Sequence, residues 1–150
     1  MGWWRYHIWY HSDVKVVLDT NVLYSAVRSR RGASFALLQR VGTGAFQPVL
    51  SVALCLEYED VLLREPTPLP AAAVHDLLDY LVSVSLHQRI HFLWRPALRD
   101  PKDDMVLELA ANAGCPYIVT FNVRDFRGSD RFGVTAITPP DFLALLGGTS

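Results

Sequence analysis

A short apolar run that ends in a carboxylate constrains this chain more than any other feature. Residues 14–18 (Val-Lys-Val-Val-Leu) are rich in β-branched side chains, which is typical of a strand buried on both faces. The run stops at Asp19-Thr20-Asn21, and apolar residues resume with Val22-Leu23. A buried strand followed by helix-capping residues places Asp19 at the carboxyl edge of a parallel sheet, where open α/β folds bind their ligands. The alternative is that Asp19 serves only as a helix N-cap.

Composition limits the class of protein. The 150 residues are 51% hydrophobic and carry a formal charge of −1, so one domain with a substantial core is expected. This charge excludes a generally basic nucleic-acid-binding surface but permits a local basic patch. Cys55 and Cys115 lie in apolar surroundings without a C-x-x-C motif, which indicates buried thiols and a reducing, cytoplasmic compartment. The apolar runs are too short to span a membrane.

Apolar segments alternate with turn and capping residues along the whole chain. Residues 1–13 form an aromatic arm of unknown role, and residues 14–150 are predicted to form a single domain. The predicted helices cover residues 22–27, 34–41, 51–64, 71–86, 100–113 and 141–146. The predicted strands cover residues 14–18, 46–50, 90–94, 117–120 and 134–137. Strands that alternate with helices predict an α/β fold with a parallel sheet covered on both faces.

Carboxylates inside otherwise apolar helices are the next candidates for chemistry. Glu57 lies on an apolar stripe of its helix, where a charge is costly unless it is paired or bound to a cation. Glu59 lies in similarly apolar surroundings, so periodicity does not choose between the two. In the helix after Asp100-Pro101, the helix dipole alone explains Asp103. Asp104 immediately precedes Met105-Val106-Leu107, so its side chain could face the edge of the sheet.

A further polar group follows the strand at residues 117–120, where Asn122 and Asp125 come directly after Thr120-Phe121. Asp125 taken alone is a common turn residue. If several of these carboxylates converge, their mutual repulsion calls for a cation. Oxygen ligands without a thiol or imidazole cluster indicate Mg²⁺ or Mn²⁺, which activate water for phosphodiester hydrolysis.

Five segments together resemble the PIN domain. They are VVLDTNVLYSA, LCLEYEDVLLREP, RDPKDDMVLELAANAG, YIVTFNVRDF and ITPPDFLALL, in the family's order and approximate spacing. The closest resemblance is to toxin components of toxin–antitoxin systems, the VapC-type ribonucleases, and it covers residues 14–146. It implies a three-layer α/β/α sandwich with a central parallel sheet, and hydrolysis of RNA that depends on one or two Mg²⁺ or Mn²⁺ ions.

The resemblance also assigns roles to residues. It implies that Asp19, Glu57 and Asp104 are catalytic metal ligands, with Asp125 or the neutral Asn122 completing the set. It implies supporting polar roles for Thr20, Asn21, Thr120 and Asn122. Arginines able to contact RNA phosphates are predicted at Arg28, Arg30, Arg31, Arg124 and Arg127. Toxin–antitoxin membership would add a small antitoxin partner and a homodimer.

Two alternatives stay open on the sequence. An α/β phosphatase could use Asp19 as a nucleophile, but the haloacid-dehalogenase pattern needs a second Asp where this chain has Asn21. A PIN fold with weak metal binding could instead act as a binding module for a protein or RNA. The replacement of a family Asp by Asn122 is the one feature that favours this second alternative.

Overall fold

Five parallel strands form the centre of the molecule. The computed structural model describes residues 14–90 and 98–147. Its strands are β1 (Lys15–Leu18), β2 (Gln47–Leu50), β3 (Leu86–His87), β4 (Tyr117–Val119) and β5 (Thr135–Ile137). Their order is β3-β2-β1-β4-β5, and every neighbouring pair is parallel. β1 is the central strand, and Val16 and Val17 in it are fully buried, as the apolar run predicts for a strand covered on both faces.

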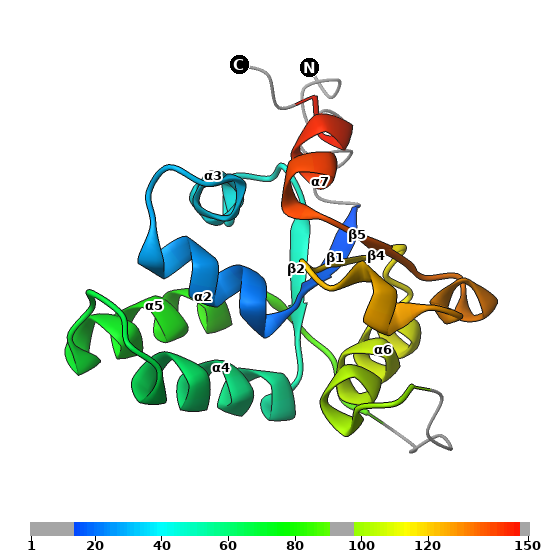
Figure 1. The fold of residues 1–150 in the computed structure, drawn as a ribbon, viewed down its shortest axis with the longest axis horizontal. Coiled ribbons are helices and arrows are strands. Elements are labelled where there is room, and N and C mark those ends of the chain that lie inside the picture. Colours follow the sequence, from blue (N-terminus) through cyan, green and yellow to red (C-terminus); the bar gives the residue numbers. More distant parts are fainter. Residues whose placement is uncertain (1–13, 91–97, 148–150) are drawn as a thin grey trace, which may run out of the picture.

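Helices cover both faces of this sheet. The helices are α2 (Thr20–Arg28), α3 (Ala33–Arg40), α4 (Val52–Arg64), α5 (Ala71–Val84), α6 (Pro101–Ala113) and α7 (Pro139–Leu145). Figure 1 shows α2, α4 and α5 on one side of the strands and α6 on the other, where α6 contacts β1, β2 and β4. The predicted α/β fold, with a parallel sheet between two helical layers, is confirmed.

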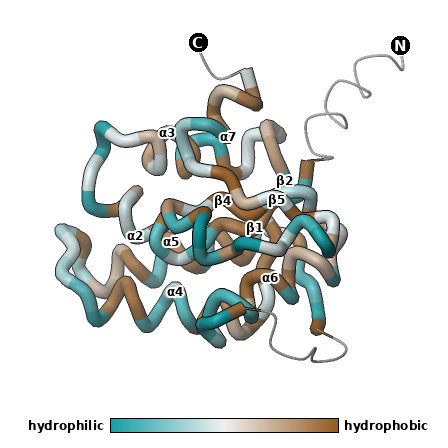
Figure 2. The backbone as a smooth tube through the Cα atoms, turned by 45° about the vertical axis from the view of Figure 1, so that its right-hand side comes forward, coloured by the Kyte–Doolittle hydropathy of each residue, from teal (hydrophilic) through white to brown (hydrophobic). Residues whose placement is uncertain are grey.

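The helices present their apolar sides to the sheet. Along α4 and α5 the colour in Figure 2 alternates between hydrophilic and hydrophobic, as expected for helices with one face against a core. On α4 the buried positions are Leu54, Tyr58 and Leu62, one helical turn apart. None of the helices in the described ranges is long and apolar enough to cross a membrane.

Capping side chains fix where several helices begin. The Asp19 carboxylate accepts a hydrogen bond from the Thr20 N–H, and the Ser51 hydroxyl accepts one from the Leu54 N–H. Asp100 caps α6, with Pro101 as its first residue, and Thr138 caps α7. Because Asp19 and Ser51 directly follow β1 and β2, strand ends and helix starts meet at the carboxyl edge of the sheet.

The third strand differs from the prediction. The helix expected over residues 71–86 ends at Val84, because Ser85 adopts an extended conformation (φ −94°, ψ 151°). Leu86–His87 then pairs with Val49–Leu50 as the edge strand. The strand predicted at residues 90–94 is therefore wrong at Ile90, which is not in a strand, and residues 91–94 lie outside the described residues. The aromatic arm at residues 1–13 also lies outside them.

Two short 3-10 turns follow β4. η1 (Val123–Phe126) and η2 (Ser129–Phe132) connect β4 to β5. Phe126 is buried and anchors η1, whereas Asn122 and Asp125 on this connection are exposed. The connection therefore presents polar side chains beside the carboxyl edge of the sheet.

Candidate active site

Asp19 lies at the centre of the carboxyl edge and is held on both of its oxygens. Its Oδ1 accepts a hydrogen bond from the Thr20 N–H at 2.8 Å, and its Oδ2 accepts one from the Thr120 hydroxyl at 2.8 Å. Asp19 is 9% exposed. Burial raises the pKa of Asp19, the two hydrogen bonds act in the opposite direction, and the nearby charges of Glu57 and Asp125 raise it further. An N-cap alone does not require the second contact, from Thr120 directly after β4.

The polar residues predicted to support Asp19 form a connected set. The Asn122 N–H donates to the Thr120 hydroxyl oxygen at 3.0 Å, which leaves the hydroxyl proton for Asp19. Asn21 accepts a hydrogen bond from the Phe121 N–H at 3.5 Å, linking the start of α2 to the end of β4. The Asn122 carbonyl accepts from the Asp125 N–H at 2.9 Å. These contacts fix the position of Asp19 relative to the loop that carries Asp125.

On α4 the structure separates the two glutamates that periodicity could not. Glu57 faces the sheet edge, where its charge raises the pKa of Asp19, and its side chain is 18% exposed. The Lys102 ammonium lies 3.6 Å from the Glu57 carboxylate. Glu59 points instead toward α5, where its carboxylate lies 3.5 Å from the His75 ring. Glu57 is therefore the α4 carboxylate beside Asp19.

On α6 two neighbouring acids lie in different surroundings. Asp104 is 8% exposed, and its Oδ1 accepts a hydrogen bond from the Leu98 N–H at 2.8 Å, so it holds the segment that precedes the helix. Asp103 faces the cluster. Its pKa is raised to about 6, first by burial and then by the charges of Asp19, Asp100, Asp125 and Asp104, in that order. In the sequence, the favourable helix dipole was sufficient to explain an acid at Asp103, so Asp103 was not predicted as a site residue.

Four carboxylates thus influence one another at the edge of the sheet: the charges of Glu57 and Asp125 act on Asp19, and those of Asp19 and Asp125 act on Asp103. They come from the residue after β1, from α4, from α6 and from η1, which the parallel sheet brings together. Carboxylate oxygens without thiol or imidazole ligands are a donor set suited to Mg²⁺ or Mn²⁺. Within residues 14–90 and 98–147, no three His, Cys, Asp or Glu side chains already converge closely enough to hold an ion.

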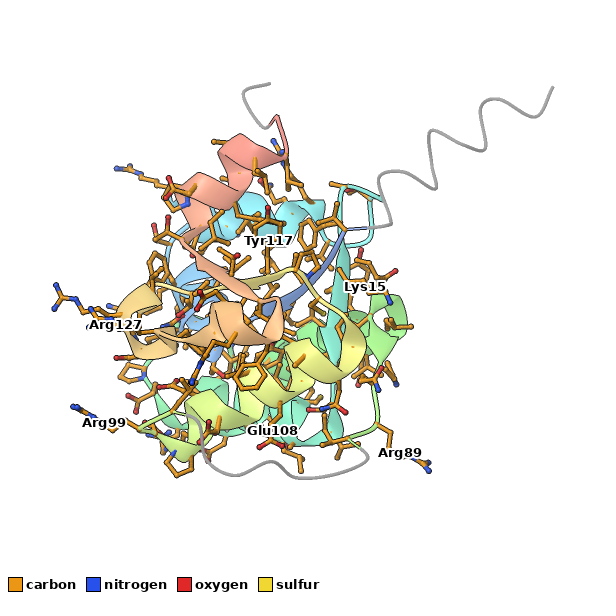
Figure 3. The ribbon with its side chains drawn as sticks, turned by 90° about the vertical axis from the view of Figure 1, so that its right-hand side faces the viewer. Lys15, Arg89, Arg99, Glu108, Tyr117 and Arg127 are labelled. Carbon is orange, nitrogen blue, oxygen red and sulfur yellow. The ribbon has the colours of Figure 1, made fainter. Side chains whose placement is uncertain are left out.

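Arginines share a cleft with two of these acids. A hollow of about 790 Å³ contains Asp103 and Asp125 together with three arginines. Its lining residues are Leu98, Arg99, Asp100, Pro101, Asp103, Arg124, Asp125 and Arg127. Figure 3 shows Arg99 and Arg127 projecting from the same side of the molecule. A cleft that combines carboxylates with arginines can hold a cation and a polyanion side by side.

The predicted RNA-contacting arginines fall into two groups. Arg124 and Arg127 line this cleft, and Arg99, which the sequence argument did not select, joins them. Arg28, Arg30 and Arg31 are exposed at the opposite end of α2 from Asp19, and Arg28 stacks over the Tyr24 ring at 5.2 Å. A nine-residue helix is about 13 Å long, so this second group lies away from the acids. A basic residue directly before the α6 cap was the signal that could have identified Arg99.

Comparisons with known proteins agree with this architecture. The family model described as "PIN domain" matches residues 15–124. A solved structure, VapBC2 from Rickettsia felis bound to a DNA fragment from their promoter, is similar with a TM-score of 0.57. The match covers 83% of this chain and 98% of that chain at 12% sequence identity, so the likeness concerns the fold. No curated protein sequence matches the chain.

Proposed function

This chain belongs to the PIN-domain family, and from that premise we propose that it is a metal-dependent endoribonuclease, the toxin of a toxin–antitoxin pair. The observation that carries the proposal is the group of four carboxylates at the carboxyl edge of the sheet, two of which have a raised pKa. Like charges held together in a partly desolvated site are stabilised by a bound cation. The arginines in the adjoining cleft supply the complementary charge for a phosphate backbone.

The proposed ligands are Asp19, Glu57, Asp103 and Asp125. We prefer Asp103 to Asp104, the acid that the sequence motif indicates, because Asp103 lines the cleft together with Asp125 and lies within the field of Asp19 and Asp125. Asp125 is preferred to Asn122, because the charge of Asp125 acts on both Asp19 and Asp103. Asp125 is exposed and Glu57 is paired with Lys102 at 3.6 Å, so these two side chains can move toward an ion that the more fixed Asp19 binds.

Each residue then has a defined task in phosphodiester hydrolysis. One or two bound Mg²⁺ or Mn²⁺ ions would supply a water of lowered pKa and a Lewis acid for the leaving oxygen. Thr120 keeps the Asp19 carboxylate oriented by its hydrogen bond. Arg99, Arg124 and Arg127 bind the phosphates that flank the reacting one, which holds the chain in line for attack.

The proposal extends to partners. The similar structure is described as VapBC2 with promoter DNA, and this supports a small antitoxin as the partner of the present chain. An antitoxin segment would inhibit the enzyme by covering the cleft at Asp103 and Arg124. We also propose a homodimer and a cytoplasmic location, both of which follow from toxin–antitoxin membership.

Calorimetric titration with Mn²⁺ combined with an RNA cleavage assay tests the proposal. Wild type is expected to bind Mn²⁺ and to cleave RNA only when the ion is present, and Asp19→Asn is expected to lose both properties. Asp60→Asn is the matched control, because Asp60 is an exposed α4 carboxylate paired with Arg64, and it should behave as wild type. A wild-type protein that binds neither Mn²⁺ nor RNA would refute the nuclease. Binding of RNA without Mn²⁺ binding or cleavage would favour the PIN-fold binding module.

A further inference from the structure

Phe121 is the feature that the proposed chemistry does not explain. It follows Thr120 directly, and Thr120 holds the Asp19 carboxylate. Its side chain is 45% exposed although it is a large apolar group. Single exposed aromatic residues are common on protein surfaces, so exposure alone carries no conclusion.

The surroundings of Phe121 point to a ligand. Phe121 lines a second hollow of about 730 Å³ between β5 and the two 3-10 turns. Arg124, Asp125 and Arg127 line both this hollow and the cleft that contains Asp103. The two hollows therefore share a boundary, with the acids on one side of it and the aromatic ring on the other. A nucleic acid whose phosphate lies at the acids can place a base in the second hollow.

We infer that Phe121 is a base-stacking site for the nucleotide beside the cleaved bond, with Arg124 and Arg127 holding the adjoining phosphates. Adjacent Cα atoms are about 3.8 Å apart, so the residue that carries the ring is next to the one that orients Asp19. An exposed aromatic ring stacks on any base, and arginines that line the same hollow bind the backbone without reading sequence. The arginines between the ring and the acids carry the charge that a phosphate backbone running from one hollow to the other requires.

Stacking on Phe121 places a condition on the base that it contacts. A base inside a duplex is already stacked between its neighbours and must be extruded before Phe121 can contact it. Contact with Phe121 therefore requires the base beside the cleaved bond to be unpaired. This inference rests on the proposed ribonuclease function and adds a residue that sets its specificity.

Steady-state cleavage of a short single-stranded RNA with Mn²⁺ tests the inference. Phe121→Ala is expected to raise KM about tenfold with a smaller change in kcat, since one stacked base is worth about a factor of ten or more. Phe121→Tyr should restore the wild-type KM, because tyrosine offers the same ring. Phe132→Ala is the matched control: Phe132 is 37% exposed on η2 and does not line the hollow, so its KM should not change.

A second substrate separates stacking from a structural effect. An RNA with one abasic ribose beside the cleaved bond should lose about tenfold in kcat/KM with wild type. Phe121→Ala should show no such additional loss, which is the coupling expected of two groups in contact. An unchanged KM in Phe121→Ala, or an abasic penalty that persists in it, would overturn the inference. Failure of wild type to cleave RNA at all would instead refute the proposed function, and this inference with it.

Discussion

Helix α4 carries the candidate acids Glu57 and Glu59, helix α6 carries Asp103 and Asp104, and the two members of each pair lie in different surroundings. On α4 the charge of Glu57 acts on Asp19, whereas Glu59 lies beside His75 of α5. On α6 the charge of Asp19 raises the pKa of Asp103. Its neighbour Asp104 accepts a hydrogen bond from the Leu98 N–H. In each helix the other acid is engaged by a group from elsewhere in the chain, the His75 ring on α4 and the Leu98 backbone N–H on α6.

The second acid of each pair, Glu59 on α4 and Asp104 on α6, also differs in burial and in contacts. Glu59 is partly exposed, with its side chain 43% accessible, and its pairing with His75 is a surface contact of small energetic value. Asp104 is almost fully buried, and its hydrogen bond satisfies an N–H that would otherwise be unpaired. We therefore expect Glu59 to be dispensable and Asp104 to have a structural role. Substitutions should separate these two cases.

The largest effect is expected on α6. Asp103→Asn should reduce Mn²⁺-dependent RNA cleavage by about 100-fold or more, because loss of a ligand costs at least as much as loss of the groups that orient ligands. Asp104→Asn keeps an oxygen for the Leu98 N–H and should retain most of the activity. Cleavage rates of the two purified variants, with circular dichroism as a check on folding, measure this contrast. Greater loss in Asp104→Asn than in Asp103→Asn would return the metal-ligand role to Asp104.

On α4 a smaller contrast is expected. Glu57→Gln should weaken Mn²⁺ binding by about 10- to 100-fold, since a neutral oxygen replaces a charged ligand at a mobile position. Glu59→Gln should leave the affinity unchanged, because its carboxylate faces His75. Calorimetric titration of both variants gives the two affinities directly. Equal losses in the two variants would mean that general negative charge on α4, not the facing position, attracts the ion.

The stability of the metal-free protein should depend on Asp103 with a defined sign. Because the folded state raises the pKa of Asp103 to about 6 from 3.8, folded protein binds more protons than unfolded protein in this window. Stability therefore falls as the pH rises from about 4 to about 6, and the cost is fully present above that. After allowance for solvent screening, the cost is about 1–2 kcal/mol.

Urea unfolding in EDTA measures this cost. At about pH 7.5, Asp103→Asn should be more stable than wild type by about 1–2 kcal/mol, and the difference should disappear near pH 4. Asp60→Asn, which alters a carboxylate 59% exposed on its side chain, should show no such pH-dependent gain. A metal-free Asp103→Asn protein that is less stable than wild type at neutral pH would show that the Asp103 charge is stabilised in the fold.

The sequence predicted those parts of the fold that local chemistry determines. Val16 and Val17 form the buried central strand, and Asp100-Pro101 begins α6 as its capping pattern predicts. The short edge strand at Leu86–His87 was missed, because two exposed residues carry no periodic signal and gain their structure from pairing with β2. Tertiary pairing here outweighs local propensity.

The candidate site was predictable to a similar degree. Asp19 follows from its position at the end of a buried strand, and its contact with Thr120 confirms that the two strand ends meet. The choice between Asp103 and Asp104 was not accessible to sequence reasoning, because it depends on the Leu98 N–H of the segment before α6. Arg99 was missed for the same reason, because its place in the cleft depends on how the segment before α6 folds.

The smallest effect is expected from loss of the hydrogen bond that joins α4 to β1. The Tyr58 hydroxyl is buried and donates a hydrogen bond to the Leu18 carbonyl. Leu18 directly precedes Asp19, and Tyr58 directly follows Glu57. Tyr58→Phe should destabilise the protein by about 1 kcal/mol and weaken Mn²⁺ binding a few-fold, because this bond holds Glu57 and Asp19 in register. Tyr80→Phe is the matched control: the Tyr80 hydroxyl also donates to a backbone carbonyl, that of Val41, but Tyr80 is 46% exposed, so water can replace the bond. Urea unfolding and Mn²⁺ calorimetry of both variants should therefore show a loss of Mn²⁺ affinity in Tyr58→Phe alone. Equal affinities in the two variants would mean that the packing of α4 is sufficient to place Glu57 beside Asp19 without this hydrogen bond.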